Sequence, residues 1–197
     1  MSGSGDNISH VLVGFKRTGK STYIRRIIDQ CYHPKQKILI VTQTDPEAYG
    51  KFRRAESESQ LRAWKFGPVK YYNRKSRKQM LQTILDLAED GILRNGAVIF
   101  EDATSYITGN PPDEILDFLI NHRMYFLDLY FILHSLTDVP PKLWRNVTSV
   151  TVFKTAENES LIRERKMIPN LDKVLEAWKK VKTDPDMRKS ITVSTGI

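Results

Sequence analysis

A glycine-bracketed loop is the part of the sequence whose residue types and spacing point most directly to chemistry. The run Gly14-Phe15-Lys16-Arg17-Thr18-Gly19-Lys20-Ser21-Thr22 fits the G-x-x-x-x-G-K-[ST] template of a phosphate-binding loop. Its glycines let the backbone wrap around phosphate oxygens, so that successive N–H groups point inward as an anion nest. Lys20 can reach the outer phosphates, and the hydroxyl of Ser21 can ligate Mg²⁺. We therefore expect residues 14–22 to bind a nucleotide.

The flanking sequence supports this interpretation over an ordinary glycine-bearing loop. Residues 10–13 form an apolar run that is typical of a buried strand, and residues 23–28 have apolar side chains at helical spacing. A strand, a glycine loop and a helix in this order are the supersecondary unit that phosphate binding needs.

A second set of chemical groups follows the apolar run at residues 98–100, namely the adjacent acids Glu101 and Asp102. Hydrolysis of a nucleotide needs one carboxylate in the magnesium shell and another that positions the attacking water. We expect Glu101 to hold Mg²⁺ and Asp102 to orient or deprotonate the water. The two roles could be exchanged, and the alternative is a strand that simply ends in solvated acids.

A histidine occupies a comparable place after residues 130–133, which also read as a buried strand. A polar side chain there can sense whether the γ-phosphate is present, so His134 is a candidate sensor. The alternative is a histidine that is satisfied locally at a strand end.

Strand-like and helix-like segments alternate along the chain, which predicts an α/β fold with a mostly parallel central sheet. Together with the phosphate-binding loop, this predicts the three-layer sandwich of a P-loop NTPase of the RecA/ASCE type. Further strands are expected over residues 37–42, 69–72 and 150–153, and helices over residues 77–88, 113–122 and 171–182. We expect a flexible leader at residues 1–8, one ATPase domain at residues 9–182 and a loosely held tail at residues 183–197.

Composition narrows the class of protein. The 197 residues are 40% hydrophobic and 27% charged, as in a soluble globular domain, and no apolar run is long enough for a membrane span. The net charge of +8 favours an anionic partner such as nucleic acid. The single Cys31 excludes an internal disulfide, and a cytoplasmic setting is the default.

Several blocks beyond the loop resemble the FtsK–HerA superfamily of P-loop ATPases. They are residues 98–102, residues 121–123, residues 128–140, Asn146 and residues 150–154. Within the superfamily the sequence is most similar to the poxvirus-type genome-packaging ATPases of double-jelly-roll capsid viruses. The phage-assembly ATPases of the zonular occludens toxin type are also similar. Two departures are His134, where the family usually has Gln, and the order Glu-Asp in the acidic pair.

The resemblance implies an ATPase that uses ATP and Mg²⁺ to move DNA, with packaging of double-stranded viral DNA as the expected role. It implies a homo-oligomeric ring in the host cytoplasm or virion, with a capsid vertex or portal component as a further candidate partner. In such rings a neighbouring subunit supplies an arginine finger to the nucleotide. Arg123 matches the family's arginine before the sensor strand, and Arg145 is the reserve candidate. The alternative for Arg123 is a plain surface arginine.

A motor also needs contacts to DNA. Basic residues are dense between Lys51 and Lys78 and are interleaved with Trp64, Tyr71 and Tyr72, a pattern that could follow a phosphate backbone. The candidates for these contacts are Arg74, Lys75, Arg77 and Lys78. A solvated charged surface is the alternative.

A small nucleoside or nucleotide kinase is the alternative function, because its length and loop would look the same. The acidic pair and the strand end at His134 suit attack by water better than transfer to a bound acceptor. A GTPase is disfavoured because the sequence has no Asn-Lys-x-Asp run to read guanine. A non-catalytic P-loop scaffold stays open, because binding does not prove turnover.

Overall fold

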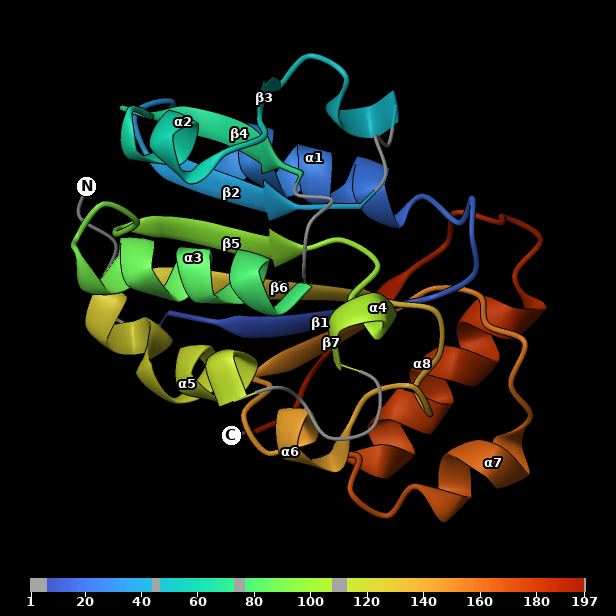
Figure 1. Ribbon diagram of the computed structural model, residues 1–197. Helices are drawn as coiled ribbons and strands as arrows, with labels where there is room; N and C mark the ends of the chain where they lie inside the picture. Colours follow the sequence, from blue (N-terminus) through green and yellow to red (C-terminus); the bar gives the residue numbers. More distant parts are fainter. Residues whose placement is uncertain (1–6, 44–46, 73–76, 108–112, 197) are drawn as a thin grey trace.

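The computed structural model describes residues 7–43, 47–72, 77–107 and 113–196. Within these residues the centre of the molecule is one eight-stranded sheet of order β3-β4-β2-β5-β6-β1-β7-β8 (Figure 1). Its strands are β1 Ser9–Val13, β2 Lys37–Val41, β3 Arg53–Ala55, β4 Gly67–Tyr71, β5 Gly96–Phe100, β6 Leu127–Leu133, β7 Ser149–Val152 and β8 Ile191–Ser194. Each pairing from β3 to β7 is parallel, and β8 runs antiparallel to β7.

Helices cover both faces of this sheet (Figure 1). The α-helices are α1 Lys20–Cys31, α2 Glu58–Arg62, α3 Arg77–Glu89, α4 Thr104–Ile107, α5 Asp113–Asn121, α6 Pro141–Trp144, α7 Glu159–Glu164 and α8 Leu171–Thr183. Two short 3₁₀ helices, η1 Glu47–Tyr49 and η2 His122–Tyr125, complete the described elements. No described helix is long and apolar enough to cross a bilayer.

The alternation of side chains along each strand divides the interior into two cores. Val11 and Val13 of β1 belong to a large core with residues of α3, α5 and α8. Leu12, between them, points to the opposite face and packs in a second core with Ile24 and Ile28 of α1. The result is helices, sheet and helices in three layers, so the predicted P-loop NTPase fold is confirmed.

The strand order brings the chemical groups to one edge. β1 lies between β6 and β7, and β6 separates β1 from β5. Because these strands are parallel, the segments that follow Val13, Phe100 and Leu133 all leave the sheet at its carboxyl edge. In open parallel sheets this edge is where ligands bind.

The C-terminal segment corrects one expectation. We expected residues 183–197 to be loosely held, but Ile191–Ser194 form β8 and complete the sheet beside β7. Val193 is buried there, and the hydroxyls of Thr151 and Thr192 are 2.7 Å apart. The strand forms because three β-branched residues, which favour extended backbone, meet an open sheet edge.

Candidate nucleotide-binding site

The phosphate-binding loop has the shape that its glycines permit. A Cβ atom at Gly14 would lie only 2.6 Å from the Cβ of Phe153, so no larger residue fits there without displacing the segment that follows β7. Gly19 has φ 92°, a left-handed conformation that favours glycine, and it directly precedes α1. The loop therefore leads directly into the N-terminus of α1, and its residues Lys16, Arg17 and Gly19 line the cavity there. The N-terminus of a helix is a favourable site for an anion.

Lys20 is buried at the centre of the loop. Its Nζ donates hydrogen bonds to the carbonyl oxygens of Gly14, at 2.5 Å, and Phe15, at 2.6 Å. Burial lowers the pKa of Lys20 to about 8, although Glu101 and Asp102 oppose the shift. The ammonium group is thus held on the loop's inner side, where it can meet phosphate oxygens.

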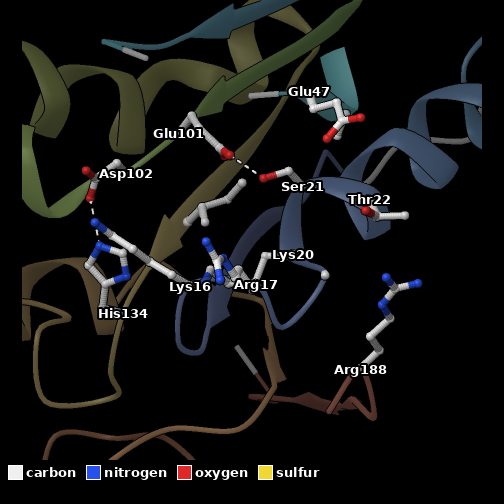
Figure 2. A pocket seen from close by; sticks show the side chains of 13 residues that line it. Lys16, Arg17, Lys20, Ser21, Thr22, Glu47, Glu101, Asp102, His134 and Arg188 are labelled. Carbon is white, nitrogen blue, oxygen red and sulfur yellow. Dashed lines mark hydrogen bonds and ion pairs between the residues drawn. The ribbon is translucent and has the colours of Figure 1, made fainter. Parts of the chain in front are cut away.

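A direct contact joins the loop to the acidic strand end. The Ser21 hydroxyl donates to Glu101 Oε1 at 2.5 Å (Figure 2). The other carboxylate oxygen, Oε2, is buried and has no hydrogen-bond partner among the described residues. The Tyr49 hydroxyl lies near this pair without a hydrogen bond of standard geometry. Burial raises the pKa of Glu101, and the Ser21 hydrogen bond and the Lys20 charge only partly offset this.

These two groups fit a magnesium ion. Mg²⁺ takes oxygen ligands, keeps several waters and needs only one or two protein groups besides the substrate phosphates. The buried, unpaired Oε2 of Glu101 beside the Ser21 hydroxyl is the kind of donor set that such an ion satisfies. The described residues contain no cluster of three or more His, Cys, Asp or Glu that could hold a metal ion.

Asp102 is held in a different way from Glu101. Its Oδ1 accepts a hydrogen bond from the Thr104 hydroxyl at 3.0 Å and lies 3.2 Å from Nε2 of His134 (Figure 2). Its φ of 51° turns the chain sharply at the end of β5. The carboxylate is about half exposed, with a side-chain exposure of 47%. Asp102 and His134 therefore form a polar pair that is open to the cavity.

Lys20, Ser21, Glu101, Asp102 and His134 line one cavity of about 630 Å³, whereas Gly14, Phe15 and Thr18 of the loop do not. Its walls are Lys16, Arg17, Gly19, Lys20, Ser21, Thr22, Glu47, Ala48, Glu101, Asp102, Ile132, His134 and Arg188. The structure thus brings the phosphate-binding loop together with Glu101, Asp102 and His134 in one cavity. Sequence reasoning missed Glu47 and Arg188, because each lies in a polar stretch far from any motif.

The arginine-finger candidates lie outside this cavity. Arg123 is exposed in η2, immediately before the amino end of β6, and Arg145 is exposed at the end of α6. Neither lines the cavity that its own chain forms. A role at the nucleotide of a neighbouring subunit therefore stays a prediction.

The basic stretch before α3 differs from the DNA-contact pattern that we expected. Trp64 and Tyr71 are buried, with exposures of 3% and 1%, so they pack in the core and cannot stack on bases. The indole N–H of Trp64 donates hydrogen bonds to the carbonyl oxygens of Phe66 and Gly67, so its one side-chain polar group is satisfied in the core. Of the candidate contacts, Arg74 and Lys75 lie outside the described residues, as does the Arg77 side chain, and Lys78 is exposed on α3.

The parallel sheet, with the glycine loop between β1 and α1, has the P-loop NTPase fold. No protein-family model and no curated protein sequence matches the chain. Among solved structures, the chain resembles the genome-packaging NTPase B204 of Sulfolobus turreted icosahedral virus 2. The B204 complex with sulfate has a TM-score of 0.74 and 20% identity, over 97% of this chain and 92% of B204.

Two further structures show the same fold. The B204 complex with ATP-gammaS has a TM-score of 0.72 and 20% identity, over 96% of this chain and 92% of B204. The pCW3 conjugation coupling protein TcpA has a TM-score of 0.57 and 11% identity, over 82% of this chain and 52% of TcpA.

Proposed function

We propose that this protein is an ATP-hydrolysing DNA translocase that packages a viral genome. The observation that carries the proposal is the contact of Ser21 with Glu101, because it joins the phosphate-binding loop to the acidic strand end in one cavity. The likeness to B204 over nearly the whole of both chains supports packaging as the role.

The site residues fit hydrolysis by water. The loop N–H groups and Lys20 bind the outer phosphates, and Ser21 with Glu101 would hold Mg²⁺, which neutralises charge on the β- and γ-phosphates when bound. Asp102 holds the attacking water and accepts its proton as the water oxygen bonds to the γ-phosphorus. The bond from that phosphorus to the β,γ-bridging oxygen breaks, and Lys20 stabilises the charge that develops on the leaving ADP.

His134 acts on this step through Asp102. Its Nε2 lies 3.2 Å from the carboxylate, so it can orient the base and respond when the γ-phosphate leaves. Arg123 would complete the site of a neighbouring subunit in a homo-oligomeric ring around double-stranded DNA. Arg74, Lys75, Arg77 and Lys78 remain candidate contacts to its phosphates, and a capsid vertex or portal component remains a candidate partner.

The test is steady-state ATP turnover with and without double-stranded DNA. We expect slow turnover alone and faster turnover with DNA, since a motor couples the two. Asp102→Asn should lower kcat by roughly a hundredfold or more, the usual effect of losing a general base, while ATP still binds. Lys20→Ala should abolish ATP binding.

Two outcomes would contradict the proposal. Turnover that ignores DNA but requires a small nucleoside or nucleotide acceptor would identify a kinase. ATP binding without turnover under any of these conditions would identify a non-catalytic scaffold. The matched control is Arg165→Ala, which removes a charge on an exposed residue outside the cavity.

A further inference from the structure

Arg188 brings a cation from the far end of the chain into the nucleotide cavity. It lies between α8 and β8 and lines the cavity with the loop residues. Its side chain crosses over the loop, because its Cγ is 3.6 Å from the point where a Cβ on Gly19 would lie. Figure 2 shows its guanidinium on the side of Thr22, opposite to Asp102 and His134.

The turn that carries Arg188 is built to hold it there. Asp184 Oδ1 accepts from the backbone N–H of Asp186 at 2.9 Å, and Asp186 Oδ1 accepts from the N–H of Arg188 at 2.8 Å. The ammonium group of Lys154, which follows β7, donates a hydrogen bond to the carbonyl oxygen of Asp184. The turn is therefore tied to the sheet just before β8 begins, and the backbone of Arg188 is fixed.

The guanidinium itself has no carboxylate partner among the described residues. Among the described residues, the exposed Arg62 and Arg163 pair with an acid at 2.7–2.8 Å. The exposed Arg123, Arg145 and Arg165 have no such pair there, and Arg188 differs from these three because it lines the nucleotide cavity. Both acids of the proposed hydrolytic site lie on the other side of the cavity (Figure 2). A cation that is positioned over a cavity without a protein anion is suited to an anionic ligand.

The geometry of the loop indicates which part of a nucleotide Arg188 meets. The γ-phosphate must face Glu101, Asp102 and His134, because those groups would act on it. Thr22 and Arg188 lie on the opposite side of the cavity from Asp102 and His134 (Figure 2). A nucleotide whose γ-phosphate faces the acids would therefore extend past the N-terminus of α1 toward Arg188.

We propose that Arg188 binds the α-phosphate of the nucleotide held by its own chain. The inference rests on the proposed function, and it makes the C-terminal turn part of the binding site. Arg188 then contributes equally to ATP and ADP, since both carry the α-phosphate. Asp102 and His134 differ in this respect, because they act at the γ-phosphate, which ATP has and ADP lacks.

The experiment measures dissociation constants of ATP and ADP, with Mg²⁺, for the wild type, Arg188→Ala and Arg188→Lys. Because the variant loses a charge-assisted hydrogen bond to the α-phosphate, we expect Arg188→Ala to raise the dissociation constants of ATP and ADP by about tenfold or more. Arg188→Lys should restore part of the loss, because it keeps the charge without the planar fork. Arg165→Ala is the charge-matched control and should bind as the wild type does. Equal thermal midpoints without nucleotide would show that each variant is folded.

Three results would overturn the inference. They are unchanged affinities in Arg188→Ala, a loss confined to ATP, or an equal loss in Arg165→Ala. Failure of the nucleotide site itself looks different: the wild type and Lys20→Ala would then bind ATP equally or not at all. Failure of the motor function alone would leave these affinities intact and appear as turnover that does not respond to DNA. If Lys20→Ala loses binding and Arg188→Ala does not, only the inference about Arg188 fails.

Discussion

Position 102 shows why the second acid of the pair is an aspartate. Its φ of 51° lies in the left-handed region, which Asp and Asn occupy more readily than longer side chains because their short polar groups bond locally. The Thr104 hydroxyl makes such a local bond to Asp102 at 3.0 Å. The order Glu-Asp, which departs from the family's common pair, therefore fits the backbone of this strand end.

The left-handed backbone at Asp102 predicts different effects on stability for two substitutions. Asp102→Glu should lower the free energy of unfolding by about 1 kcal/mol, because Glu tolerates this conformation less well. Asp102→Asn should leave it nearly unchanged, because Asn adopts the conformation as readily as Asp. Urea denaturation measures both, and equal stability of the two variants would contradict the prediction.

Lys20 gives the site a dependence on pH. Its pKa is lowered to about 8 by burial, and only the protonated form attracts phosphate. The nucleotide phosphates bind the protonated form of Lys20. The affinity for ATP is therefore highest below pH 8 and falls as the pH rises through that value.

We therefore predict that the dissociation constant of ATP rises by up to tenfold for each pH unit above 8. Fluorescence titration between pH 7 and 9.5 measures it, at constant ionic strength. A flat profile over this range would show that Lys20 keeps its proton to higher pH.

At the scale of elements, the strands next to the site were predictable from the sequence. The apolar runs that became β1, β2, β5 and β6 are buried on both faces of a parallel sheet, so each reads as a continuous hydrophobic segment. The loop, the two acids and His134 each follow one of these runs directly, and parallel strands bring such positions to the same edge. The core of the candidate site was therefore predictable as well.

Other elements were hidden for physical reasons. The three-residue edge strand β3 has the polar sequence Arg-Arg-Ala, and two of its residues are exposed, so it carries no burial pattern. The signal for β8 was present in its β-branched residues Ile191, Thr192 and Val193, but only Val193 is buried, so the segment lacks the continuous apolar run that marked the other strands. Arg188 was not predictable, because its role depends on the turn that β8 anchors.

The pairing of β8 makes a prediction about stability. Val193 faces the core and Ser194 faces solvent on the same strand. Val193→Asp should cost about 3 kcal/mol or more, because it buries an unpaired charge. Ser194→Asp should change the free energy of unfolding by less than about 0.5 kcal/mol. Thermal or urea unfolding measures both, and equal effects would mean that β8 is not held on the sheet.

At the scale of the whole molecule, Arg123 and the nucleotide cavity lie at opposite edges of the sheet. The seven residues of β6 separate them, a span of roughly 20 Å at the rise of a strand. Ile120, Met124 and Phe126 near Arg123 are 68%, 69% and 61% exposed, so this edge presents large apolar side chains at its surface. Arg123 lies too far from the cavity of its own chain to act there, so the proposed finger role requires a neighbouring subunit.

Mixing two inactive variants tests this arrangement. Arg123→Ala subunits keep an intact cavity, and Lys20→Ala subunits keep Arg123. We expect each variant alone to lack DNA-stimulated ATP turnover and the mixture to regain part of it. A Lys20→Ala, Arg123→Ala double variant is the control and should not restore Arg123→Ala. Full activity of Arg123→Ala alone would exclude the residue as the finger, and Arg145 would be tested next.

The central place of β1 also has a consequence for biosynthesis. Ser9 pairs with Leu129, and His10 pairs with Ser149, so β1 leaves the ribosome well before the partner strands that it needs. Until β6 and β7 have emerged, the glycine loop has no walls to fix its shape, and the nascent chain exposes an unpaired apolar strand. ATP therefore cannot assist the early steps of folding, and this strand is the segment that a chaperone would shield during translation.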